Sequence, residues 1–247
     1  MRAVHCALCI LMALALGACA HGRPSHEVTL RLDLAEAYLA SRKPQLALQE
    51  LLATSDRAQH LPRYHFDLGM TYYALDQLDQ AQTSLKRAVE IDPTYGEAWN
   101  NLGRVLEVQK RTEEAAAAYQ RALSILTYAT PELAAVNLAR LHLGQGKPEE
   151  AESLARLAIR RNWLYAPAYI LLAQILESRG DLKAAQETLE EGIAANLNAP
   201  ALKLALAENM LRQGKTTEAK ALFHELTQRH AGSHEASLAK DYLGILP

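Results

Sequence analysis

Residues 97–122 read EAWNNLGRVLEVQKRTEEAAAAYQRA, with two stripes of apolar residues at helical spacing on either side of a polar turn. The turn, residues 109–112, is so short that it predicts an antiparallel pair of helices. Gly103 and Ala115 are small where the two helices would touch. Trp99, Leu102 and Tyr119 are large enough to fill the space beside that contact. The segment therefore predicts a closely packed helical hairpin.

The same pattern recurs along the 247-residue chain with a period of about 34 residues. In six successive copies position seven is always leucine, position eight is Gly or Ala, and position twenty is Ala. The leucines are Leu34, Leu68, Leu102, Leu138, Leu172 and Leu206. Trp-x2-Leu-Gly followed by Ala-x3-Tyr-x2-Ala resembles the tetratricopeptide repeat. The resemblance implies an all-α superhelical solenoid of six helix-turn-helix repeats.

The predicted repeats are residues 28–61, 62–95, 96–131, 132–165, 166–199 and 200–232, with one two-residue slip at 127–131. Gly146, Gly180 and Gly214 share one repeat position, where we expect a left-handed residue to end the first helix. Residues 233–247 predict a C-terminal capping helix with Ser233 as its N-cap. Such a helix would cover the apolar end of the last repeat.

The N-terminus carries a different signal. Arg2 precedes an apolar stretch, residues 6–16, that is too short to span a bilayer comfortably. It ends in Leu16-Gly17-Ala18-Cys19, which resembles a bacterial lipobox. The resemblance implies a signal peptide, residues 1–18, that is removed, a lipid on Cys19, and a tether that makes up the rest of 19–27. The alternative is an ordinary signal peptide in which Cys19 is incidental.

Composition excludes several classes of function. All three cysteines lie in the first nineteen residues, so no disulfide framework is expected in the repeats. The net charge of −2 gives no basic field for nucleic acid. His224, His230 and His234 lack ligand-like spacing with carboxylates and are interpreted as surface residues, so we expect no metal site. No nucleophile with a placed base and no cofactor fingerprint is present, which predicts a protein without catalytic residues or cofactors.

The predicted function therefore lies on the surface. In the first two repeats, an apolar patch is expected on the groove formed by the first helices: Leu32, Leu39, Phe66, Met70 and Tyr73. Such a patch on a monomer usually marks a binding site. The alternative is that some of these side chains pack against the next repeat or the tether.

Polar groove residues are expected in the third and fourth repeats: Asn100, Asn101, Arg104, Asn137 and Arg140. Asn and Arg three residues apart lie on one helix face. In many peptide-binding tetratricopeptide proteins an Asn in this slot bonds the backbone of an extended ligand, so the resemblance implies peptide contact. Solvated or inter-repeat roles are the alternative.

The layout of lipobox, tether and six repeats resembles the type IV pilus pilotins of the PilF, PilW and Tgl kind. That resemblance implies a lipoprotein on the periplasmic face of the outer membrane of a Gram-negative bacterium. Its partner would be the pilus secretin, whose targeting and multimerisation it would promote. We expect a monomer that touches the membrane only through its lipid. The alternative is a periplasmic lipoprotein adaptor for peptidoglycan-remodelling enzymes or another envelope complex.

Overall fold

The structure is a computed structural model that describes residues 24–246, and those residues form helices and connecting turns without any strand. The helices form two compact units that divide after Ile91. No helix within residues 24–246 is long and apolar enough to cross a bilayer. The predicted all-α array of six helix pairs followed by a capping helix is confirmed.

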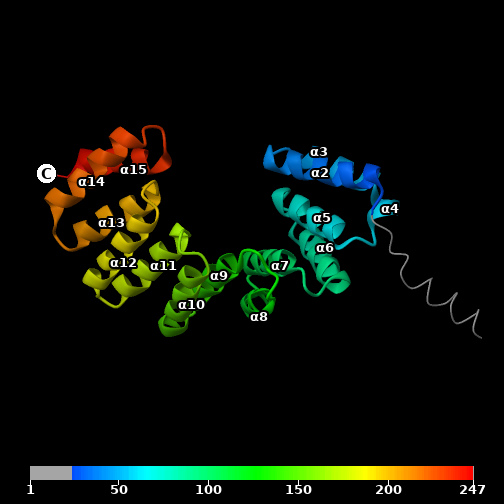
Figure 1. Ribbon diagram of the computed structural model, residues 1–247, viewed down its shortest axis with the longest axis horizontal. Coiled ribbons are helices and arrows are strands. Elements are labelled where there is room, and N and C mark those ends of the chain that lie inside the picture. The colour runs from blue at the N-terminus through cyan, green and yellow to red at the C-terminus, as the bar shows by residue number, and fades with distance from the viewer. Residues whose placement is uncertain (1–23, 247) are drawn as a thin grey trace, which may run out of the picture. The chain divides into compact units, whose positions relative to one another are not determined.

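Unit 1 contains the first two helix pairs (Figure 1). The first pair is α2 (His26–Ala40) and α3 (Pro44–Ala53), followed by the short α4 (Ser55–Ala58). The second pair is α5 (Pro62–Ala74) and α6 (Leu78–Ile91). Because α5 packs against both α2 and α3, the apolar residues of the two pairs form one core.

Unit 2 contains the remaining pairs: α7 (Gly96–Val108) with α8 (Thr112–Ser124), α9 (Pro131–Gly144) with α10 (Pro148–Arg161), α11 (Ala166–Ser178) with α12 (Leu182–Ala195), and α13 (Pro200–Arg212) with α14 (Thr216–Arg229). The last helix is α15 (His234–Ile245), which packs on α14 and α13 as the first helix of a further repeat would. The Ser233 side chain accepts a hydrogen bond from the Ala236 N–H at 3.1 Å, which confirms the predicted N-cap.

The two helices of a pair approach so closely that positions eight and twenty have no room for a larger side chain. Ala115 is completely buried. A Cβ added to Gly103 would lie 2.6 Å from the Tyr119 ring, and one added to Gly69 would lie 2.6 Å from Leu85. These distances are far below van der Waals contact, so at Gly69 and Gly103 even an alanine would force the facing side chain to move.

The turn between the helices of a pair uses a left-handed residue in all six repeats. Gly146, Gly180 and Gly214 have φ of 72°, 82° and 77°, which confirms their predicted role. At the same position the first three repeats place Arg42, Asp76 and Lys110, with φ of 56°, 59° and 63°. The turn therefore imposes its geometry even where a side chain makes that geometry costly.

The first repeat departs from the predicted pattern at position seven. Five of the six leucines are buried, but Leu34 is 37% exposed. The expectation that Leu34 fills space beside the helix contact is therefore wrong. Its neighbour one turn earlier, Leu30, is 57% exposed. The physical reason is that no described helix precedes α2 to cover this side chain, whereas α5, α9, α11 and α13 each pack on the second helix of the preceding repeat.

Gly103→Ala is predicted to destabilise the protein by about 1–3 kcal/mol, because the new methyl group would overlap the Tyr119 ring. The matched control is Gly144→Ala, at a helical position where an added Cβ would meet nothing within 4 Å. That change should leave stability unchanged or raise it by up to about 1 kcal/mol. Urea unfolding followed by circular dichroism measures both. Equal midpoints for Gly103→Ala and the unchanged protein would contradict the close-contact account.

Candidate partner-binding surface

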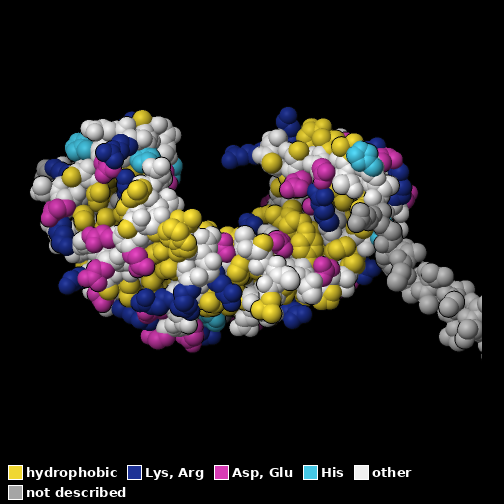
Figure 2. All heavy atoms as spheres, in the orientation of Figure 1, with side chains coloured by type: hydrophobic (Ala, Val, Ile, Leu, Met, Phe, Trp, Pro, Cys, Tyr) yellow, Lys and Arg dark blue, Asp and Glu magenta, His cyan; other side chains and the backbone are white. Residues whose placement is uncertain are grey.

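Four of the five side chains predicted to form an apolar patch in unit 1 lie on α5 and α2 and are partly exposed, whereas the fifth is buried. Phe66, Met70 and Tyr73 are partly buried and lie at i, i+4 and i+7 of α5, so they share one helix face. Leu39, on α2, is also partly buried and packs against the core of unit 1. Figure 2 shows hydrophobic side chains gathered over α5.

Leu32 does not belong to this surface. It is 2% exposed and lies in the core cluster of unit 1, so the expectation that it faces a groove is wrong. The reason is that α5 packs against α2 and α3 and encloses the side of α2 that carries Leu32. We call the remaining set, Leu39, Phe66, Met70 and Tyr73, the α5 patch.

A cluster of charged residues adjoins the α5 patch. The Arg63 guanidinium lies 2.7 Å from an Asp33 oxygen and 3.0 Å from a Glu36 oxygen, both on α2. It also lies 3.6 Å from Asp67, one turn further along α5. Three carboxylates thus surround one guanidinium, which leaves this part of unit 1 with an excess of negative charge. The sequence reasoning missed this cluster, although opposite charges at repeat positions two and six were visible.

Asp67 is the buried member of the cluster. It is 5% exposed, and its Oδ2 atom has no hydrogen-bond partner. Burial raises the pKa of Asp67 to about 7; Arg63 opposes that rise, while the neighbouring Glu36 and Asp33 carboxylates add to it. This carboxyl group therefore changes between its protonated and deprotonated forms near neutral pH.

In unit 2 the predicted polar residues form a hydrogen-bonded row along α7 and α9. Asn100 is 4% exposed, and its Oδ1 accepts a bond from Asn137 Nδ2 at 3.0 Å. The expectation that Asn100 faces a groove is wrong, because its amide joins two neighbouring repeats. Arg104 donates to Asn101 Oδ1 at 2.9 Å, and Arg140 donates to Asn137 Oδ1 at 3.4 Å.

The amide side chains of this row can still form hydrogen bonds with a peptide. Asn101 Nδ2 donates to the Glu97 carbonyl at 2.8 Å, which uses one of its two hydrogens. An amide group has two donor hydrogens and two acceptor lone pairs, so Asn101 and Asn137 can each form another bond. Arg140 is exposed. Peptide contact by Asn101, Arg104, Asn137 and Arg140 stays a prediction.

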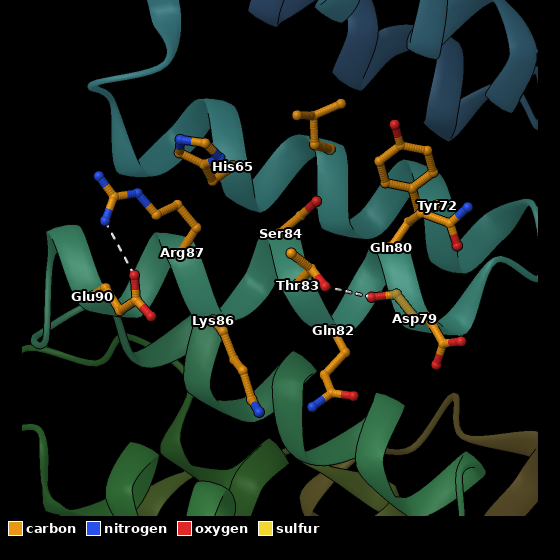
Figure 3. Close-up of a pocket in the computed structure, with 11 residues that line it drawn as sticks. His65, Tyr72, Asp79, Gln80, Gln82, Thr83, Ser84, Lys86, Arg87 and Glu90 are labelled. Carbon is orange, nitrogen blue, oxygen red and sulfur yellow. Dashed lines mark hydrogen bonds and ion pairs between the residues drawn. The ribbon is translucent and has the colours of Figure 1, made fainter.

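The hollow in unit 1 that Figure 3 shows is lined by other residues. It is an open cleft of about 760 Å³ on a different side of α5. The side chains that α6 contributes to it are mainly polar, and several residues bond within one element: Arg87 pairs with Glu90 at 3.1 Å, and Thr83 donates to the Asp79 carbonyl at 2.8 Å. The cleft contains no residue of the α5 patch.

Within the described residues, no group of three or more His, Cys, Asp or Glu side chains is arranged to hold a metal ion. Cys19, the predicted lipidation site, lies outside the described residues.

Comparisons with known proteins identify the repeats. Models of the tetratricopeptide repeat match residues 66–132, 142–208 and 201–233. The chain is also similar to the ycf37 protein of Porphyra purpurea, at 32% identity over 90 residues, which are 36% of this chain and 49% of that protein. The chain thus spans about half the length of this curated relative.

Two solved structures share the fold over most of their length. One is PilW, a widely conserved type IV pilus biogenesis factor, with a TM-score of 0.72 and 21% identity. The match covers 87% of this chain and 98% of PilW. The other is PilF of Pseudomonas aeruginosa, with a TM-score of 0.72, 18% identity, and coverage of 90% of this chain and 98% of PilF.

Asp67→Asn is predicted to stabilise the protein at pH 8 by about 1–3 kcal/mol. Because the folded-state pKa of Asp67 is raised from 3.8 to about 7, folded protein holds this proton more tightly than unfolded protein. The residue's contribution to stability is therefore greatest below pH 4 and falls as the pH rises to 7.

Urea midpoints at pH 5 and pH 8 measure this effect. Asp67→Asn should reduce the loss of stability between these two values, whereas Glu90→Gln, at an exposed position of α6 outside the cluster, should retain it. An unchanged pH dependence in Asp67→Asn would contradict the assignment.

Proposed function

We propose that this tetratricopeptide-repeat chain is a lipid-anchored pilotin, which promotes outer-membrane targeting and multimerisation of the type IV pilus secretin. The observation that carries the proposal is the likeness to PilW, which covers 87% of this chain and 98% of that protein at a TM-score of 0.72. The tetratricopeptide scaffold supports the broader role, because such repeats bind protein partners along an extended surface.

The lipobox-like sequence supports the anchor. Cleavage before Cys19 would leave six residues, 20–25, between the modified cysteine and α2, which begins at His26. Several acyl chains on one residue anchor stably, whereas a single chain binds only marginally. Ala20 follows the cysteine, and lipoproteins that resemble this one at that position are sorted to the outer membrane. We therefore propose a location at the periplasmic face of the outer membrane.

This proposal uses two binding surfaces, the α5 patch within unit 1 and the polar row of α7 and α9 within unit 2. Partly buried Phe66, Met70 and Tyr73 offer apolar area, which supplies affinity when a partner covers it. Arg104 and Arg140 lie beside amides that can bond a peptide backbone. In this proposal the chain acts by binding its partner while its lipid holds it at the membrane, and it has no catalytic role.

Deleting the gene is predicted to remove heat-resistant secretin multimers from the outer membrane. The unchanged gene should restore them, and a Cys19→Ser version should not. Immunoblots of unheated membrane fractions measure the multimers. Since Cys19 lies outside the described repeats, the Cys19→Ser protein should fold normally, which circular dichroism checks.

Two outcomes would overturn the proposal. Normal secretin multimers in the deletion strain would exclude the pilotin role. Unchanged outer-membrane fractionation of Cys19→Ser would exclude the anchor. If the protein captures a peptidoglycan hydrolase or synthase while secretin assembly is normal, the adaptor function takes its place.

A further inference from the structure

Unit 2 contains a pocket that belongs to none of the surfaces described above, although His234 is one of its lining residues. It has a volume of about 300 Å³ and is lined by α11, α13 and α15, with Leu189 of α12. The lining residues of α11 and α13 occupy the repeat positions that form the inner row of first helices. Because α15 packs on α13 and α14 as another first helix would, it completes the pocket at the C-terminal end of that row.

The pocket has an apolar part. Ala173 and Leu204 are 2% and 9% exposed, and Ile170, Ala205 and Leu238 are partly buried. These side chains come from three different helices, and Leu238 belongs to the capping helix. A volume of about 300 Å³ is at the low end for small-molecule sites, so the space suits one or two side chains of a peptide.

The pocket also has an acidic part. Glu177, Glu208 and Glu235 line it, together with one guanidinium, that of Arg212. Asn209, which is completely buried, donates to Glu177 Oε1 at 2.7 Å, and Arg212 donates to the same atom at 3.1 Å.

Glu208 is fixed in a similar way, since its Oε1 accepts a hydrogen bond from the Tyr242 hydroxyl at 3.0 Å. Two carboxylates are thus held in place before any ligand arrives, which lowers the entropy cost of binding.

We propose that this pocket binds a peptide of a partner protein through one apolar side chain with a Lys or Arg next to it. The apolar side chain would lie against Leu204, Ala205 and Leu238, and the cation would pair with Glu208 and Glu177. The excess of carboxylates over cations makes a basic peptide the complementary ligand. The inference does not rest on the pilotin role, because it specifies peptide chemistry rather than the protein that supplies it.

The role of α15 follows from this assignment. It covers the end of the last repeat, where Ala239 is fully buried in the core. The Tyr242 ring stacks on the Phe223 ring, with 4.8 Å between the ring centroids. The helix also supplies one side of a binding site through Leu238 and Glu235. The capping helix is therefore part of the recognition surface as well as a cover.

The test uses the full chain carrying Cys19→Ser and a fluorescein-labelled peptide with Lys-Leu-Lys between Gly-Ser ends. Fluorescence anisotropy measures its affinity, and methyl NMR spectra locate the contact. We expect shifts at the Leu204, Leu238 and Ile170 methyl groups. We also expect binding at least roughly fivefold weaker for peptides with Glu-Leu-Glu or Lys-Ser-Lys in the same place.

Two variants separate charge from shape. Glu208→Gln keeps the volume and removes one charge, and Ala205→Leu fills the space, so each should weaken binding roughly fivefold or more. Glu187→Gln, on α12 and away from the pocket, is the matched charge control and should bind as before. If Ala205→Leu fails to fold, Glu208→Gln decides the question alone.

Equal binding of the Lys-Leu-Lys and Glu-Leu-Glu peptides, methyl shifts confined to other helices, or undiminished binding by Glu208→Gln would overturn the inference. Secretin assembly is a separate readout, so failure here leaves the pilotin proposal standing, and the reverse also holds.

Discussion

The close approach of two helices within each repeat is the contact on which the rest of the structure depends. Glycine or alanine at position eight lets a bulky partner lie directly against the backbone, as Tyr119 does against Gly103. This explains a composition that is 49% apolar but only 6% aromatic. Each helix pair is built by local contacts, and within each unit neighbouring pairs then pack on one another. Stability is therefore spread along the chain, and most positions outside the contact are free to vary.

That freedom explains why the scaffold could be predicted and part of the surface could not. The helix pairs, the left-handed turns and the Ser233 cap depend on neighbours in sequence, and six copies repeat the same signal. Position five carries no such constraint. It is buried at Leu32 and Asn100 but partly exposed at Phe66, because its burial depends on how neighbouring repeats pack. The position of a residue in the repeat therefore predicts its packing role better than it predicts how exposed its side chain is.

The charged features arise from tertiary structure in the same way. Asp67 has an elevated pKa mainly because it is buried away from water, and the Glu36 and Asp33 carboxylates that α2 brings close add to the rise. The pocket at the end of unit 2 requires a helix outside the repeats. Neither arrangement has a signature within one repeat. In our proposals, partner recognition thus comes from residues that depart from the repeat pattern, whereas the fold comes from residues that follow it.

The central functional claim is that the partner of the proposed pilotin binds at the α5 patch of unit 1. Photo-crosslinking in living cells tests it most directly, with a photoreactive amino acid at position Met70 or, for comparison, at the exposed Gln49 on α3. The account predicts that Met70 crosslinks to the secretin and that Gln49 does not. Crosslinks from Gln49 in the absence of any from Met70 would contradict it.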